Sequence, residues 1–170
     1  SDPNRKYVSK ARNAVWDKDL EETAAVPPEE RAALDRFFRH GLMITGLTHL
    51  AGVPIMAGTD ASDTMIVPGF SLHRELALLE RAGLSPMDAL RSATSVPARY
   101  LGRARLNGGI SAGKEADLVL LRADPLSDVR NIGSIEAVIS DGRLFDRAAL
   151  DSLLAEAERS ALASAATERR

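Results

Sequence analysis

The chain has 170 residues, and its 22 Lys and Arg against 24 Asp and Glu give a formal net charge of −2. With 45% hydrophobic and 27% charged residues it has the composition and length of one ordinary folded domain. The near-neutral charge, two tyrosines and one tryptophan argue against a nucleic-acid surface, which needs clustered cations and stacking rings. No apolar run approaches the roughly 18 residues of a membrane span, and residues 1–10 lack the apolar core of a signal peptide. We therefore expect a soluble protein with neither nucleic acid nor membrane as a partner, in a compartment that the sequence leaves open.

Metal-ligating side chains are scarce. The absence of cysteine excludes disulfides, cysteine-ligated zinc, iron–sulfur clusters and thiol nucleophiles. The three histidines, His40, His49 and His73, form neither a His-x-His nor a His-x-x-x-His pair. His40 and His49 are nine residues apart, which on one helix places them on opposite faces. The sequence thus argues against a zinc site formed by this chain alone.

In the N-terminal third of the chain, the helical spacing of apolar residues is weak at first and then becomes strong. Residues 1–26 are polar and weakly periodic, which predicts a loop with short helical pieces. Pro28, Glu29 and Glu30 mark a helix start, because proline suits the first helical position and acidic residues favour the positive end of the dipole. Apolar residues then recur at helical spacing, which predicts one long helix with a glycine cap at Gly52; they are Leu34, Phe37, Phe38, Met43 or Ile44, Leu47 and Leu50.

The central residues have the order of a βα unit. Residues 53–57 are wholly apolar, which predicts a strand buried on both faces, as in parallel sheets and barrels. An irregular stretch follows up to Phe70, and helical spacing of apolar residues then predicts a helix over 71–83. Ser85-Pro86-Met87-Asp88 has the form of a capping box that opens a further helix. A second short helix is predicted after Pro97, ending at Gly102.

The C-terminal part of the sequence predicts several β-strands followed by one helix. Residues 116–121 predict a strand, and Asp141-Gly142 joins residues 135–139 to 143–145 as a hairpin with a two-residue turn. Three or four strands would form a small β-unit. Asp146 is predicted to cap a last helix, which we expect to fray from about Ser164.

Many short motifs follow one another in register over about residues 40–146. They are AGVPIMAGTDA at 51–61, AGLSP at 82–86, AL at 89–90, AT at 93–94, GI at 109–110, GK at 113–114, ADLVL at 116–120, DPL at 124–126 and VISDG at 138–142. Together they resemble the C-terminal part of the metal-dependent amidohydrolases, closest to the imidazolonepropionase-like and prolidase-like members. The resemblance implies an α/β fold: a C-terminal fragment of a (β/α)8 barrel, with its last strand at 53–59, plus part of a composite β-sandwich domain built from both chain ends. Residues 1–104 would then be the last part of the barrel, 105–146 strands of the composite domain, and 147–170 a C-terminal helix and tail.

Asp60 is the first candidate site residue. It follows the predicted barrel strand, at the carboxyl end where barrel enzymes place their chemistry. The resemblance implies that Asp60 contacts a divalent metal, with zinc as the first candidate, and carries a proton from the bound water to the leaving amine. The alternative is an aspartate in a turn or a helix cap. His73, near the start of the next helix, would touch substrate or orient Asp60, or else be a polar residue of a helix start.

The sequence also departs from the family pattern. The family's other metal ligands, a His-x-His pair, a carboxylated lysine or a glutamate and two further histidines, have no counterpart here, and one barrel strand is present where eight are needed. We therefore expect the C-terminal part of a hydrolase that cleaves an amide, lactam or peptide-like C–N bond of a small-molecule or peptide-like substrate. Its partner would be the remaining N-terminal part of the barrel. The chain alone would be inactive. It would also self-associate, as a homo-oligomer. The alternative is a non-catalytic binding or assembly module on the same scaffold; an esterase or deaminase stays open.

Overall fold

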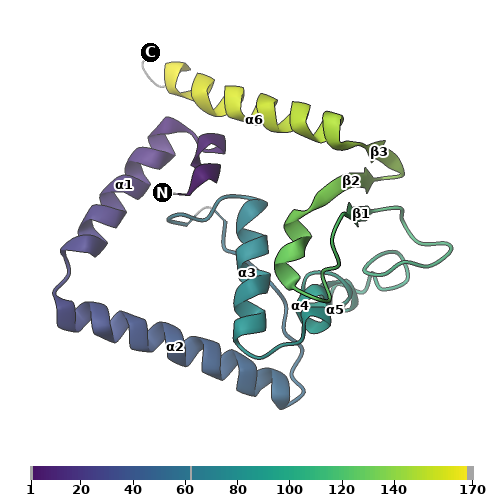
Figure 1. The fold of residues 1–170 in the computed structure, drawn as a ribbon, viewed down its shortest axis with the longest axis horizontal. Helices are drawn as coiled ribbons and strands as arrows, with labels where there is room; N and C mark the ends of the chain where they lie inside the picture. Colours follow the sequence, from purple (N-terminus) through teal and green to yellow (C-terminus); the bar gives the residue numbers. More distant parts are fainter. Residues whose placement is uncertain (1, 62, 168–170) are drawn as a thin grey trace.

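The protein is described from a computed structural model that places residues 2–61 and 63–167, drawn in Figure 1. Helices α1, α2 and α6 form three sides of a frame in that view, and α3 lies inside it. The elements in chain order are η1 (Pro3–Tyr7), α1 (Lys10–Ala25), α2 (Pro28–Leu50), α3 (Phe70–Arg81), α4 (Pro86–Ser92), α5 (Ser95–Tyr100), β1 (Leu118–Leu121), η2 (Val129–Gly133), β2 (Ile135–Ser140), β3 (Arg143–Phe145) and α6 (Arg147–Thr167).

Over residues 2–26 the predicted loop with short helical pieces agrees with the structure only at the five-residue η1; it is wrong over 10–25, which form the single 16-residue helix α1. Ser9 caps α1 by accepting a hydrogen bond from the backbone of its first turn. Arg5 of η1 donates to the Asn13 side chain at 2.7 Å, which joins the two helices. Trp16 is the only large side chain of α1 that is fully buried, at 1% exposure. Polar contacts and one aromatic anchor hold this helix, and for that reason it shows no apolar periodicity.

Helix α2 confirms the predicted long helix and its glycine cap. It begins at Pro28 and ends just before Gly52, whose φ of +80° is the left-handed conformation typical of a helix end. The predicted apolar face is largely in solvent, because its residues from Leu34 to Leu50 are 46–80% exposed. The one buried residue of α2 is Gly46, which faces α3.

Residues 53–59 form no strand, so the predicted buried strand is wrong for this structure. Val53 and Met56 are exposed, while Ile55 and Ala57 pack against the core. The Ala57 N–H donates to the Ser92 carbonyl at 3.0 Å. A strand needs a hydrogen-bonded neighbour, and the strands within residues 2–61 and 63–167 all belong to a separate sheet.

Helices α3 and α4, together with η2, supply most of the hydrophobic core. Helix α3 confirms the helix predicted over 71–83, and the capping box of α4 is formed: the Ser85 hydroxyl donates to Asp88 Oδ2 at 2.6 Å and accepts from the Asp88 N–H at 3.1 Å. Helix α5 begins two residues before Pro97, because a first turn tolerates proline. The buried core residues come from α3, α4, η2 and the turn between α3 and α4: Leu76, Leu79, Leu84, Ala89, Val129 and Ile132.

The three strands form an antiparallel sheet in the order β1-β2-β3, which confirms the small β-unit. Val138 in the central strand lies opposite Val119 in β1 and Phe145 in β3. Asp141 and Gly142 have φ values of +50° and +74°, as a two-residue hairpin turn requires. The predicted hairpin is therefore confirmed.

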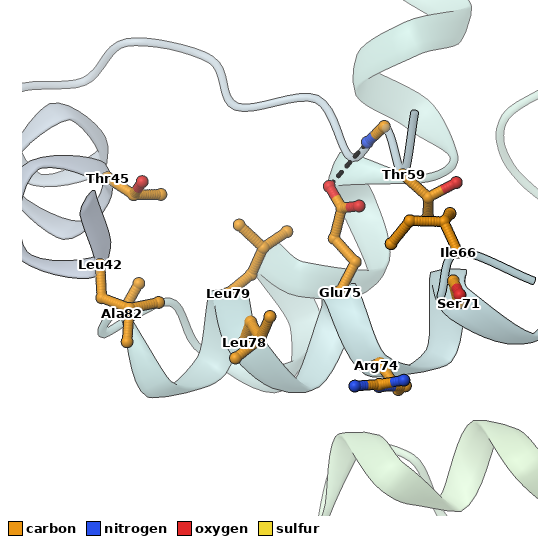
Figure 2. A pocket seen from close by; sticks show the side chains of 11 residues that line it. Leu42, Thr45, Thr59, Ile66, Ser71, Arg74, Glu75, Leu78, Leu79 and Ala82 are labelled. Atoms are coloured by element: carbon orange, nitrogen blue, oxygen red, sulfur yellow. Dashed lines mark hydrogen bonds between the residues drawn. The ribbon is translucent and has the colours of Figure 1, made fainter. Parts of the chain in front are cut away.

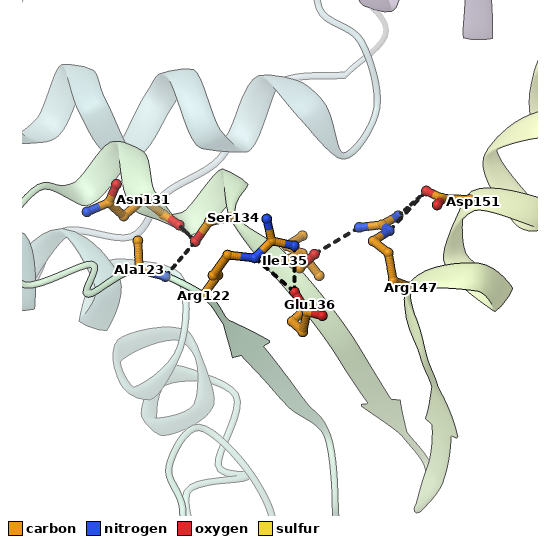
Figure 3. Close-up of polar contacts among 8 residues, drawn as sticks. All are labelled: Arg122, Ala123, Asn131, Ser134, Ile135, Glu136, Arg147 and Asp151. Carbon is orange, nitrogen blue, oxygen red and sulfur yellow. Dashed lines mark hydrogen bonds and ion pairs between the residues drawn. The ribbon is translucent and has the colours of Figure 1, made fainter.

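Helix α6 connects the sheet to the N-terminal helices. Asp146 caps it by accepting from the Ala149 N–H at 2.8 Å, as predicted. Arg147 donates to the Ile135 carbonyl of β2 at 2.9 Å and pairs with Asp151 (Figure 3). Further along, α6 packs against η1 and α1, where Lys6 and Glu158 form an ion pair of 3.0 Å. The helix continues to Thr167, beyond the predicted start of fraying, and residues 168–170 lie outside the described part.

None of the helices described here combines the length and the apolar character that crossing a membrane demands.

Candidate functional site

Asp60 lies at the start of the loop that connects residues 53–59 to α3. Its carboxylate-bearing side chain is exposed, and its φ of +50° is a left-handed conformation that Asp and Asn adopt more readily than most other residues. The Asp60 carbonyl accepts from the Asp63 N–H at 3.1 Å, and the Asp63 carbonyl accepts from the Ile66 N–H at 3.0 Å. Asp60 therefore opens two successive turns and presents its side chain to solvent.

Glu75 of α3 holds the backbone just before Asp60. The Gly58 N–H donates to Glu75 Oε1 at 2.7 Å, the dashed contact in Figure 2. This hydrogen bond fixes the chain two residues upstream of the candidate carboxylate. The role of Glu75 could not be predicted from the sequence, because one glutamate on an amphipathic helix has no distinguishing pattern.

A pocket of about 350 Å³ lies between α2, α3 and the residues just before Asp60 (Figure 2). Leu78 and Leu79 of α3 supply apolar lining, with Ala82 just after that helix and Leu42 from α2. Thr59 and Ile66 line it from the two ends of the Asp60 loop. Arg74 and Glu75 of α3 also line the pocket, so its lining combines apolar side chains with two of opposite charge, close to Gly58 and Thr59 just before Asp60.

His73 lies on another side of α3. The His73 imidazole faces η2: a methyl group built on Gly133 of η2 would lie 3.9 Å from His73 Nδ1. His73 is half-buried, and that burial lowers its pKa. The His73 and Glu75 side chains leave the helix axis in directions about 160° apart, on nearly opposite sides of α3. Glu75 therefore faces the Asp60 segment, while the imidazole faces η2.

The other two histidines both lie on α2. His40 is exposed, and His49 Nε2 is 3.7 Å from Asp88 Oδ2. Hydrogen bonds from Ser85 and Arg91 hold the pKa of the Asp88 carboxyl below its usual value. Among the side chains that the structure describes, no three His, Cys, Asp or Glu residues gather closely enough to hold a metal ion. Asp60 can thus offer one ligand, and these residues alone do not make a metal centre.

The architecture is a helix-rich α/β protein with a small antiparallel sheet and an exposed carboxylate at the start of a loop. The sequence pattern of the amidohydrolase family matches residues 25–145, so the chain belongs to this family. This confirms the predicted resemblance.

Two curated relatives align with somewhat over half of the chain. Ochratoxinase of Aspergillus niger is 35% identical over 100 residues, which are 56% of this chain and 20% of that protein. Imidazolonepropionase of Geobacillus kaustophilus is 34% identical over 101 residues, 55% of this chain and 23% of that protein. The chain therefore spans about a fifth of the length of these relatives.

Two solved structures share the fold over most of the chain. A bottromycin amidohydrolase has a TM-score of 0.73 at 27% identity and covers 92% of this chain, which corresponds to 34% of that protein. A prolidase in complex with N-methylphosphonate-L-proline has a TM-score of 0.58 at 26% identity and covers 83% of this chain and 34% of that one.

Proposed function

We propose that this chain is the C-terminal part of a hydrolase that cleaves an amide, lactam or peptide-like C–N bond. The observation that carries the proposal is the position of Asp60, which follows an apolar segment inside the family pattern and presents an exposed carboxylate at the start of a loop. The names of the similar proteins support this bond type, since they include an amidohydrolase and a prolidase.

The proposed complete enzyme is a (β/α)8 barrel in which residues 53–59 pair with strands outside this chain. The exposure of Val53 and Met56, and of the apolar face of α2, supports a missing neighbour, because apolar side chains gain free energy when they leave water. The relatives are several times longer than this chain, which leaves room for that neighbour. In this proposal residues 1–104 belong to the barrel, 105–146 to a composite β-sandwich domain, and 147–170 to the terminal helix and tail.

Asp60 would act as a proton carrier. Asp60 and ligands outside this chain would hold a divalent metal, with zinc as the first candidate. Such a metal would supply one effect: it would lower the pKa of a coordinated water molecule towards about 7. Asp60 accepts a proton from the attacking water on one carboxylate oxygen and returns it to the leaving nitrogen. The Gly58–Glu75 hydrogen bond and the turns after Asp60 hold the backbone that carries this carboxylate. His73 faces η2 in this structure, which favours a packing role over substrate contact.

The test uses the chain joined to, or co-expressed with, the segment encoded immediately upstream, which is expected to carry a His-x-His motif. With zinc supplied, the complete enzyme is assayed against an Xaa-Pro dipeptide, an N-acyl amino acid and a lactam. Asp60→Asn is expected to lower kcat by about a hundred- to ten-thousandfold, because asparagine tolerates the left-handed backbone but cannot carry the proton.

Asp63→Asn is the matched control, because it removes an exposed carboxylate from the same pair of turns, while the asparagine Oδ1 can still accept from the Thr64 N–H as Asp63 Oδ1 does at 2.7 Å. The variant should retain the wild-type kcat. A complete enzyme that hydrolyses none of the three substrates, with no His-x-His segment upstream, would favour the non-catalytic module. An Asp60→Asn enzyme with normal kcat and full metal content would remove the proton-carrier role.

A further inference from the structure

The loop that begins at Asp60 is tied to α1. Thr64 Oγ1 donates to Asp19 Oδ2 at 2.5 Å, a contact between residues 45 positions apart in the sequence. Both side chains are partly buried, and a carboxylate acceptor makes a stronger hydrogen bond than a neutral one. This hydrogen bond attaches to the loop only four residues after Asp60.

Two further contacts join the N-terminal residues to the segment that follows Asp60. The rings of Tyr7 and Phe70 stack with their centroids 5.1 Å apart and an interplanar angle of 5°. Asp2 and Arg74 form an ion pair of 3.2 Å. Residues 2–19 thus touch the loop itself and the first and fifth residues of α3.

The far end of the loop is fixed independently of these contacts. The Val67 N–H donates to Ser71 Oγ at 2.9 Å, and the Ser71 N–H donates to the Val67 carbonyl at 3.0 Å. Both residues are buried, at 1% and 5% exposure. The near end is held by the Gly58–Glu75 hydrogen bond. Between these two fixed ends, the Thr64 side chain is bound to a distant element, α1.

The loop backbone needs such support. Asp60 and Met65 both have positive φ, of +50° and +62°, a conformation that non-glycine residues adopt infrequently and that persists where surrounding contacts hold it. Thr64 lies between them. The hydrogen bond from the Thr64 hydroxyl to Asp19 therefore restrains the two turns, whose backbone sets the direction of the Asp60 side chain.

We propose that Asp19 is a positioning residue for Asp60, acting through the Thr64 hydroxyl. Asp19 touches no reacting atom; it keeps the two turns of the loop in the conformation that presents the Asp60 carboxylate. This inference rests on the proposed function for its effect on the reaction, and a displacement of about 1 Å at a reacting group is enough to lower a rate by about a hundredfold.

The first experiment measures amide hydrogen exchange of the 170-residue chain. Asp19→Ala removes the acceptor and Thr64→Val removes the donor at nearly constant shape, so both should speed exchange at the Asp63 and Ile66 amides by about tenfold or more. Thr64→Ser keeps the hydroxyl and should restore wild-type exchange. Glu22→Ala removes an exposed carboxylate of α1 that pairs with Lys18, and should leave the loop unchanged.

The second experiment measures kcat and KM of the complete enzyme in a double-mutant cycle. Asp19→Ala should lower kcat about ten- to a hundredfold with little change in KM. In the Asp60→Asn background the same substitution should cost nothing further, because no carboxylate is left to position. A purely structural role would lower kcat equally in both backgrounds.

The two experiments separate this inference from the proposed function. Unchanged loop exchange in both Asp19→Ala and Thr64→Val overturns the positioning role even if the enzyme is active. Faster loop exchange with wild-type kcat, or equal kcat losses in the two backgrounds, also overturns it. If the wild-type enzyme hydrolyses nothing, the proposed function fails and the positioning of Asp60 for catalysis falls with it, while the exchange data still decide whether Asp19 holds the loop.

Discussion

Gly46 of α2 and Ala82 at the end of α3 approach so closely that a methyl group on Gly46 would lie 2.0 Å from the Ala82 carbonyl oxygen. Glycine within a helix is otherwise unfavourable by about 0.5–1 kcal/mol relative to alanine. The close packing of two helix backbones therefore explains this residue better than helix propensity does. The same contact places α2 along the pocket next to Asp60, since Thr45 lines that pocket.

Gly46→Ala should destabilise the chain, because the added methyl group must push α2 away from α3. Overpacking of this kind costs about 1–3 kcal/mol in the free energy of unfolding. Gly41→Ala on the same helix is the control, since a methyl group there meets nothing within 4 Å and should stabilise by up to about 1 kcal/mol. Urea unfolding followed by circular dichroism measures both, and shifts of the same sign in both variants would contradict the close-contact explanation.

The chain alone should purify without stoichiometric metal and without hydrolase activity. One carboxylate at Asp60 cannot hold zinc tightly, because structural and catalytic zinc sites use three or four protein ligands. Elemental analysis of the purified chain measures the metal content. One zinc per chain that survives dialysis against a chelator would show a site that the described side chains do not account for.

The chain should self-associate through the exposed face of α2. Phe37 and Leu50 are 78% and 80% exposed, and a contiguous apolar face of this kind drives association in water. Phe37→Lys should shift light scattering towards the monomer. Ile110→Lys is the control, because Ile110 is also highly exposed but lies in a loop outside α2. A wild-type chain that stays monomeric at high concentration would show that this face does not associate.

Acid should weaken the fold through His73. Burial lowers the pKa of His73 in the folded chain below its ordinary value of 6.5, so the unfolded chain binds the proton more readily. The free energy of unfolding should therefore fall as the pH drops from about 6.5 to the folded pKa, and level off below it. His73→Gln should remove this part of the pH dependence, whereas His40→Gln, at an exposed position, should keep it. Equal pH profiles for wild type and His73→Gln would contradict the assignment.

The elements that sequence reasoning predicted are those whose stability is local. The capping box at Ser85, the Asp141-Gly142 turn and the periodic faces of α2 and α3 are each specified by residues a few positions apart. They appear in the structure at the expected positions.

The elements that sequence reasoning missed depend on distant partners. Helix α1 is held by Arg5 and by packing against α6, and its own residues show no apolar stripe. Residues 53–59 have strand composition but no neighbouring strand within the described residues. Glu75 and Asp19 join the candidate site through the backbone of Gly58 and the hydroxyl of Thr64, and no short motif encodes such contacts.

The packing of α6 against η1 and α1 sets an order of events during synthesis. A ribosome adds roughly 5–20 residues per second, so Asp19 and Thr64 both emerge well before Glu158 can pair with Lys6. Until α6 is complete, η1 and α1 lack the helix that packs against them, and only local contacts such as the Tyr7–Phe70 stack and the Asp2–Arg74 ion pair hold them to α3. The residues of the core around α3 are therefore all available before α6 completes the support of the N-terminal helices and, through Asp19, of the Asp60 loop.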